Sequence, residues 1–178
     1  LEVVELTAEG PHPLRLAVLR FDTPTKVVEF PEARWPGTRH LGITLHGSLV
    51  GVSTWVPRAL AARPGLQLRG MAVDRSLQGT GVGGVLLEEG VARMAAQGHR
   101  LVWARARDAA LSFYQRHGFE VEGDGFVDEA TQLPHHLIIR ELAGLTPSIP
   151  VISEESAENT RPEIAERFWL VDPLDGTK

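Results

Sequence analysis

The most informative stretch of the chain is Met71-Ala-Val-Asp-Arg-Ser-Leu-Gln-Gly-Thr-Gly-Val-Gly-Gly84. An apolar run, Leu66–Val73, leads into a glycine-rich segment, and a helical pattern of apolar residues then continues from Val82 to about Gly98. Glycines let a ligand approach the backbone, and free N–H groups at a helix start attract an anion such as a pyrophosphate. This order therefore predicts a strand, an anion-binding loop and a helix, although a flexible strand-to-helix turn without a ligand stays open.

The same glycines also fit the dinucleotide fingerprint G-x-G-x-x-G, within Gly79–Gly84. In that fold the first glycine follows the strand at once, whereas Asp74–Gln78 intervene here. The next predicted strand, Leu101–Ala106, has arginines at its end, at positions 105 and 107. A Rossmann site would have an acidic residue there to bind a ribose. The sequence therefore disfavours a Rossmann nucleotide site.

The remaining patterns alternate between strand and helix. The expected elements are a first strand, a helix over Leu14–Leu19, a loop over Phe21–Pro36, strands over His40–His46 and Leu49–Val56 joined by a Gly47-Ser48 turn, a loop over Pro57–Gly65, strands over Leu66–Val73 and Leu101–Ala106, a helix over Ala109–His117, and strands over Phe119–Val121 and Leu133–Leu142. Strands that flank helices in this way predict an α/β (α+β) fold with a mixed sheet.

Composition limits the classes of function. A chain of 178 residues with 43% hydrophobic content favours one packed domain with an extension. The net charge of −5 argues against a nucleic-acid partner, and the absence of cysteine excludes disulfides and thiolate chemistry. No stretch approaches the roughly 18 apolar residues of a membrane span, and the start lacks a signal-peptide pattern. We expect a cytoplasmic protein with no membrane partner.

Three blocks of the sequence resemble the GNAT family of N-acetyltransferases. Gln78–Gly83 is similar to the family signature Q/R-x-x-G-x-G/A, and Met71–Asp74 to the strand before it. Ala110–Phe119 resembles the segment A-x-x-F-Y-x-x-x-G-F, and Leu133–His135 the late P-H element of some bacterial members. The resemblance covers about residues 1–143 and implies a GNAT-like, mostly antiparallel central sheet flanked by helices. It also implies an acetyl-coenzyme-A-dependent N-acetyltransferase.

The resemblance further implies where the cofactor, acetyl-coenzyme A, binds. In this family the strand before the glycine loop splays from the next one, which leaves main-chain groups free to pair with the pantetheine arm. The pyrophosphate would lie on amides of the glycine loop. The implied cofactor-binding residues are Met71, Val73, Gln78, Gly79, Thr80, Gly81, Val82, Gly83 and Gly84.

The implied catalytic residue is Tyr114, the only tyrosine of the chain. A neutral primary amine attacks the thioester directly, and the leaving thiolate needs a proton, which this tyrosine would donate. Because a thiol has a pKa of about 8.5, loss of the hydroxyl should slow turnover rather than abolish it. Many members carry asparagine where this chain has Arg107, which could contact a cofactor phosphate or stay solvated. A plain core role for Tyr114 is the alternative.

The general base and the acceptor are not marked by the sequence. His135, His136, Glu122 and Glu129 lie near the end of the fold where acceptors of this family bind, yet a surface role suits each of them equally, and family members also use water chains. The acceptor amine belongs to a small molecule or a peptide. Dimers are common among relatives, so a homodimer stays open. A sensor that binds coenzyme A without transferring acetyl is the alternative function.

Residues 144–178 differ in character from the rest. From Leu145 onward there are seven acidic and three basic residues, so this segment contributes −4 to the net charge. Ile149–Ser156 and Phe168–Lys178 closely resemble metal-binding blocks of the inositol-monophosphatase-like family, especially its bisphosphate-nucleotidase branch. The resemblance implies Mg²⁺ bound by Glu154, Asp172 and Asp175, with Thr177 orienting the attacking water.

This segment lacks the rest of such a site, since the earlier acidic block and the distal aspartate of that family have no counterpart. Ordering a free segment costs roughly 1 to 2 kcal/mol per residue, so three carboxylates without a frame would bind magnesium weakly. We expect an appended fragment that does not fold independently and is disordered or docked on the acetyltransferase domain. Mg²⁺-dependent phosphatase activity is the less favoured alternative. A fusion, a truncated two-domain protein and an assembly error each explain the junction.

Overall fold

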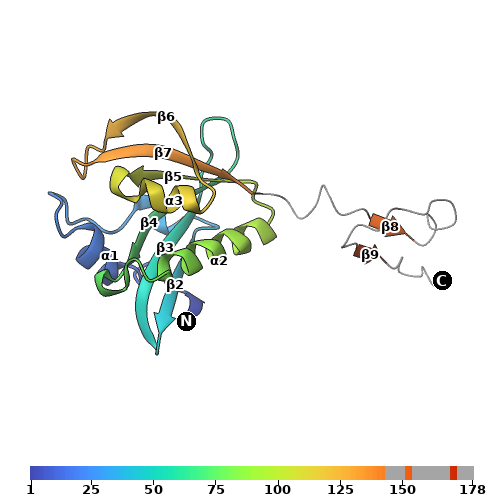
Figure 1. Cartoon of the computed structure of the whole chain (residues 1–178), viewed down its shortest axis with the longest axis horizontal. Coiled ribbons are helices and arrows are strands. Elements are labelled where there is room, and N and C mark those ends of the chain that lie inside the picture. The colour runs from blue at the N-terminus through green and yellow to red at the C-terminus, as the bar shows by residue number, and fades with distance from the viewer. Residues whose placement is uncertain (143–150, 154–168, 172–178) are drawn as a thin grey trace. The chain divides into compact units, whose positions relative to one another are not determined.

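The computed structural model describes residues 1–142, 151–153 and 169–171 of the chain. Contacts divide the chain into two units, Leu1–Leu142 and Ala143–Lys178 (Figure 1). In the second unit, β8 (Val151–Ser153) and β9 (Trp169–Val171) pair as parallel strands. The prediction that this segment is disordered or docked concerns residues that lie outside the described ones.

The first unit is an alternation of strands and helices. Its elements are β1 (Glu2–Glu5), α1 (His12–Leu19), η1 (Pro31–Arg34), β2 (Arg39–Leu45), β3 (Ser48–Pro57), β4 (Leu66–Val73), η2 (Arg75–Leu77), α2 (Val82–Ala96), β5 (Leu101–Arg107), η3 (Asp108–Ala110), α3 (Leu111–Arg116), β6 (Glu120–Val127) and β7 (Pro134–Glu141).

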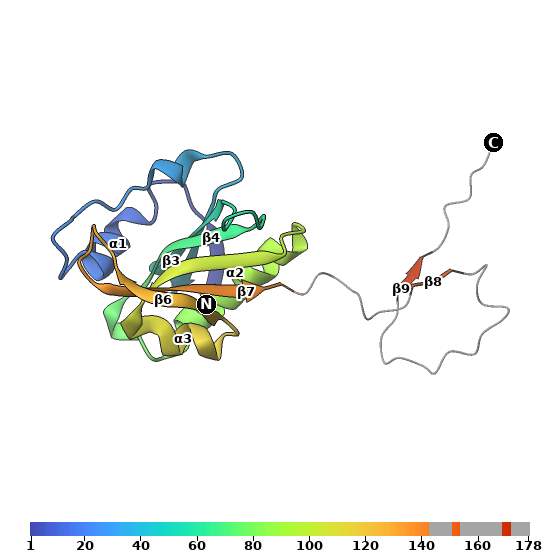
Figure 2. The same ribbon diagram turned by 90° about the horizontal axis from the view of Figure 1, so that it is seen from above.

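Seven strands form one sheet in the order β1-β2-β3-β4-β5-β7-β6. All neighbours pair antiparallel except β4 and β5, which are parallel and connected through α2. The helix α1 covers one face of the sheet, while α2 and α3 lie on the other (Figures 1 and 2). The predicted fold class, a mixed and mostly antiparallel sheet flanked by helices, is confirmed.

The main hydrophobic core lies between the sheet and α2. Alternate residues of the strands point to this face, and α2 presents Leu86, Leu87, Val91 and Met94 at helical spacing. Trp55 of β3 is fully buried and contacts α2 at Gly90, where an added Cβ would lie 2.2 Å from Trp55 Cζ2. The close approach of α2 to the sheet therefore depends on the missing side chain at position 90.

The predicted strands and helices lie close to where the patterns placed them. η1 lies within the segment predicted as a loop, Phe21–Pro36, and two further differences concern a turn and a strand. The β2–β3 turn consists of His46-Gly47, both with positive φ, rather than Gly47-Ser48, because Ser48 already pairs with Leu45. The predicted strand Phe119–Val121 differs at both ends: β6 begins at Glu120 and continues to Val127 through an irregular stretch that contains Gly123, with φ +77. Within the described residues, no helix is both long and apolar enough to cross a membrane.

We predict that Gly90→Ala destabilises the protein although alanine favours helices. The new methyl group would overlap Trp55, and overpacking of this kind costs about 1 to 3 kcal/mol, more than the gain of about 1 kcal/mol in helix propensity. The control is Gly83→Ala in the same helix, where the added Cβ would meet Val73 and Phe113 at 3.4 Å or more. Urea unfolding followed by tryptophan fluorescence measures both. Equal stability of the two variants would contradict the packing argument.

Candidate active site

The site is built around two strands that part from each other. β4 and β5 pair only at Leu66↔Val102 and Gln67↔Trp103. Beyond these pairs, Leu68–Val73 of β4 and Ala104–Arg107 of β5 share no backbone pairing, although each strand stays paired to its outer neighbour. We call these two stretches the parted segments. Side chains already occupy two carbonyls of the β4 stretch, since Gly70 accepts from Arg15 and Val73 from Gln78. The other facing N–H and C=O groups have no backbone partner across the gap and can pair with a ligand.

A β-bulge bends β4 at the start of its parted segment. Thr54 pairs with Arg69 and Val52 with Ala72, so Ser53 alone opposes Gly70 and Met71. Gly70 has φ +54 and an added Cβ would lie 2.4 Å from Arg15 Nε. Glycine is therefore required here both by the backbone conformation and by the close approach of Arg15.

Arg15 of α1 holds this bulge from the other face of the sheet. Its side chain is almost fully buried, its Nε donates to the Gly70 carbonyl at 3.0 Å, and its second guanidinium nitrogen donates to Thr54 Oγ1. Thr54 in turn bonds His40 Nδ1 at 2.7 Å, and His40 Nε2 bonds the Ala33 carbonyl at 2.9 Å. This network fixes β3, β4 and α1 relative to one another where the strands part.

The glycine loop leads from β4 to the start of α2. Asp74 accepts from the Ser76 backbone N–H at 2.9 Å, and Gln78 Nε2 donates to the Val73 carbonyl at 3.1 Å, which fixes the loop after the strand. Gly81 has φ +93 and precedes α2 without a side-chain cap. The first amides of this 15-residue helix therefore have no capping side chain, and such amides attract anions.

Two of the predicted cofactor-binding glycines have a second role in packing. Gly83 lies against Val73 and Phe113, with an added Cβ at 3.4 Å from Val73 Cγ2. At Gly84 an added Cβ would lie 2.9 Å from the His117 ring. The absence of side chains thus brings α2 close to both β4 and α3. A sequence pattern alone does not separate this role from ligand binding.

Tyr114 points from α3 to the parted segment of β4. It is 9% exposed and its ring packs edge-on against Phe113 and Phe119. Its hydroxyl donates to Met71 Sδ at 3.9 Å, and Met71 belongs to the bulge of β4. Burial raises the pKa of Tyr114 to about 12. The phenol is therefore protonated at neutral pH and lies beside the strand stretch predicted to bind pantetheine.

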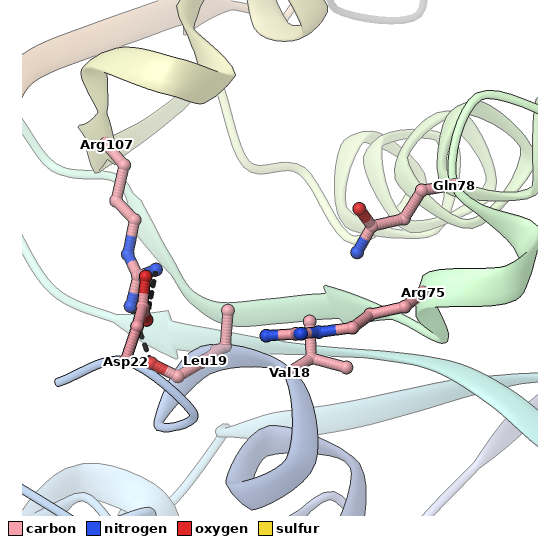
Figure 3. A pocket seen from close by; sticks show the side chains of 6 residues that line it. All are labelled: Val18, Leu19, Asp22, Arg75, Gln78 and Arg107. Atoms are coloured by element: carbon pink, nitrogen blue, oxygen red, sulfur yellow. Dashed lines mark hydrogen bonds and ion pairs between the residues drawn. The ribbon is translucent and has the colours of Figure 1, made fainter.

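A cavity of about 410 Å³ lies on the α1 side of this region (Figure 3). Its lining consists of Val18, Leu19, Asp22, Arg75, Gln78 and Arg107. Arg107, at the end of β5, donates to the Leu19 carbonyl at 2.6 Å and approaches Asp22 at 3.9 Å. The Arg107 side chain is thus bonded within the protein and mostly buried, with 25% of its surface exposed, so the alternative of a solvated arginine does not hold.

The four residues considered as general bases are each engaged elsewhere or exposed. His135 is buried, with Nδ1 2.8 Å from the Leu133 carbonyl, and His136 Nδ1 lies 2.7 Å from Asp108. Glu122 forms an ion pair with Arg63 at 2.5 Å, and Glu129 is exposed. The cavity lining contains none of the four.

Sequence reasoning missed the other charged side chains of the region. Asp22 lies in a predicted loop and Arg75 in the segment before the glycines, and no pattern distinguished either residue. Arg15 was one residue of a short predicted helix. The only available signal was a charged residue at position 15 among the apolar residues of α1. The predicted magnesium ligands Glu154, Asp172 and Asp175, together with Thr177, lie outside the described residues.

Two family models match the chain. Residues 36–121 match the acetyltransferase (GNAT) domain, and residues 91–178 match the inositol monophosphatase family. The two matches overlap at 91–121, which the structure places in the first unit, from the second half of α2 through β5, η3 and α3 to the start of β6. Both resemblances predicted from the sequence are confirmed.

Similar proteins support the same division. An uncharacterized N-acetyltransferase of Bacillus subtilis, YitI, is 26% identical over 129 residues, 71% of this chain and 87% of that protein. The 3'(2'),5'-bisphosphate nucleotidase CysQ of Salmonella typhimurium is 48% identical over 59 residues, which are 32% of this chain and only 24% of the nucleotidase. The second likeness thus concerns a short part of a longer protein.

Solved structures share the fold of the first unit. Escherichia coli ElaA aligns with a TM-score of 0.66 at 18% identity, over 79% of this chain and 99% of that one. A GNAT family acetyltransferase from Elizabethkingia anophelis with acetyl-CoA bound aligns with a TM-score of 0.61 at 15% identity, over 79% and 97%. These structures show that the first unit has the fold of acetyltransferases of known structure. The predicted enzyme class, an N-acetyltransferase, is confirmed by the family model and by the relative in Bacillus subtilis.

We predict that the folded protein loses stability as the pH falls below about 6.5. Burial lowers the pKa of His40, and the Arg15 charge lowers it further, although the hydrogen bond to Ala33 opposes this. The unfolded chain therefore takes up a proton near the ordinary histidine pKa of about 6.5, whereas the folded protein resists it. In the folded state, protonation would also deprive the Thr54 hydroxyl of its acceptor at His40 Nδ1.

The check is urea unfolding at pH 7.5 and pH 5.0. His40→Gln should reduce the loss of stability between these two pH values, while His46→Asn, at an exposed turn position with φ 49, should leave it unchanged. An identical loss in His40→Gln and in the unmodified protein would rule out His40 as its source.

Proposed function

We propose that this chain, whose residues 36–121 match the acetyltransferase (GNAT) domain model, transfers an acetyl group from acetyl-coenzyme A to a primary amine. The observation that carries the proposal is that three features of the structure lie together at the end of β4. The parted segments of β4 and β5, the uncapped start of α2 and the Tyr114 hydroxyl all meet there.

The parted segment of β4 offers main-chain donors and acceptors to an extended, amide-containing ligand such as pantetheine. It runs directly into the glycine loop, whose last residues begin a helix with free amides for a pyrophosphate. Met71, Val73 and Gln78–Gly84 thus follow one another from the end of β4 to the start of α2, with η2 between Val73 and Gln78. A neighbouring structure that contains acetyl-CoA supports this class of cofactor.

Acetyl-coenzyme A, when bound, supplies an activated thioester carbonyl. Tyr114, held protonated by burial, donates its phenolic proton to the departing sulfur. The amine attacks from the α1 side, where the cavity lined by Arg75 and Arg107 lies. The cavity lining contains no histidine, and its one carboxylate, that of Asp22, lies 3.9 Å from Arg107, so we propose that water carries away the amine proton. A coenzyme-A sensor would bind the same cofactor but release no free thiol with any amine.

Titration calorimetry with acetyl-coenzyme A tests the cofactor, with NAD and ATP as controls. We expect selective binding, and a loss of affinity of about tenfold or more in Gly81→Ala, because alanine disfavours φ +93 and the loop amides would turn. Gly98→Ala is the matched control, since Gly98 has φ +88 and equally open surroundings at the other end of α2. Equal affinity of the two variants would remove the glycine loop from the binding site.

Replacing Tyr114 by Phe tests the proton donor. We expect kcat to fall about 10²- to 10⁴-fold, the usual contribution of a general acid, with a smaller drop if the thiolate leaves readily unassisted. Thermal stability should change little, because among the described residues the hydroxyl makes one hydrogen bond, the long one to Met71 Sδ at 3.9 Å. With a pKa of about 12, Tyr114 should also cause no loss of kcat between pH 7 and pH 10 in the unmodified enzyme. An unchanged kcat in the variant would exclude this role.

A further inference from the structure

The cavity beside the parted segments is lined by more positive than negative groups. Two guanidinium groups, from Arg75 and Arg107, face it together with one carboxylate, that of Asp22. Figure 3 shows Arg107 reaching from the end of β5 to Asp22 and Leu19, and Arg75 extending toward Val18. Arg75 also stacks on Phe21, 3.9 Å from the ring centroid, so its orientation has a structural cause.

The surroundings of the cavity add further positive charge. Arginines 15, 20, 69 and 105 come from α1, its C-terminal end, β4 and β5. Glu32 forms ion pairs with both Arg58 and Arg69 at 2.6 Å, and Asp128 pairs with Arg105 at 3.3 Å. Within residues 1–142, the structure gives Arg15, Arg20 and Arg75 no ion pair.

These arginines repel one another, as their pKa values indicate. Burial lowers the pKa of Arg20, and the Arg107 charge lowers it further. Burial, followed by repulsion from Arg69 and Arg20, lowers the pKa of Arg15 to about 9. One guanidinium nitrogen of Arg15 is buried without a hydrogen-bond partner. A region with this excess of positive charge favours an anion, although the whole chain has a net charge of −5.

The cavity borders the proposed pyrophosphate site at Gln78, which lines it, but it extends away from that site toward α1. Arg107 faces the α1 side, where it bonds Leu19, whereas Tyr114 and Gly83 lie on the α2 and α3 side of the sheet. Between them lie the parted segments, through which an acetyl group would meet an amine. Guanidinium groups bind carboxylates and phosphates in two-pronged fashion, which suits recognition of a small anion.

We propose that the acceptor is an anionic amine, a primary amine that also carries a carboxylate or phosphate, with Arg75 and Arg107 binding the anionic group. This inference rests on the proposed function and names its substrate class. Polyamines and other purely cationic amines are disfavoured by the same charges. The anion fixes the acceptor at the mouth of the cavity, and its amine is directed toward the parted segments.

The test is an acetyl-transfer assay that follows release of free coenzyme A with matched amines. One set is 5-aminopentanoate, its amide and cadaverine; a second is the C-terminally amidated peptides Gly-Asp-NH2 and Gly-Asn-NH2, so that the Asp side chain supplies the only carboxylate; a third is O-phosphoethanolamine and ethanolamine. We expect a kcat/KM higher by about tenfold or more for the anionic member of at least one set, since charge-assisted hydrogen bonds are the strong ones. The first two sets against the third distinguish carboxylate from phosphate.

Two variants assign the effect to the cavity. Arg75→Gln, at an exposed position, and Arg107→Gln should each raise KM for the anionic acceptor about tenfold or more. KM for acetyl-coenzyme A and for the neutral amine of the same set should stay within about twofold, because neither compound has its binding assigned to the charges of Arg75 and Arg107. Arg100→Gln is the matched control: Arg100 is exposed and precedes β5 at the end opposite Arg107.

Each alternative outcome is decisive. A preference for neutral or cationic amines would overturn this inference and leave the proposed acetyl transfer intact. An increase in KM for acetyl-coenzyme A in Arg75→Gln and Arg107→Gln, with anionic and neutral acceptors affected alike, would overturn it in favour of a cofactor-phosphate contact. Turnover of none of the amines, despite binding of acetyl-coenzyme A, would instead refute the proposed function and the inference with it.

Discussion

The structure depends on the early end of pairing between two parallel strands. β4 and β5 share two residue pairs and then separate, while their outer neighbours hold them in the sheet. A bulge at Gly70 and Met71 bends β4, and the buried Arg15 holds that bulge through the Gly70 carbonyl. Without this separation, the backbone groups of β4 and β5 would satisfy one another and the sheet would have no place for an extended ligand.

Charge and apolar packing are divided between the two faces of the sheet. The face toward α2 and α3 carries the hydrophobic core, with Trp55 and Tyr114 among its aromatic residues. The face toward α1 carries buried and partly buried arginines, which outnumber the carboxylates that form ion pairs with them. A buried charge is retained at a considerable energetic cost, so its position marks function more strongly than a core residue does. The net charge of the chain gave no indication of this local excess.

The fold was largely predictable from the sequence because its signals are local. The run Leu66–Val73, the glycines after it and the helix from Val82 follow directly from composition and period, and family motifs added the activity. The cavity was not predictable, because Val18, Asp22, Arg75 and Arg107 meet only through the packing of α1 against β4. Likewise, the Arg15 contact to Gly70 joins residues 55 positions apart, which no periodic pattern encodes.

The narrow link between β4 and β5 also bears on how the domain unfolds. The strands β1 to β4 are hydrogen-bonded in chain order, and β5 to β7 form a second group. Only two residue pairs continue the backbone ladder between these groups, so cooperativity between them has to come from side-chain packing under α2. Amides on the two sides of this link can consequently report separate opening events in native-state hydrogen exchange.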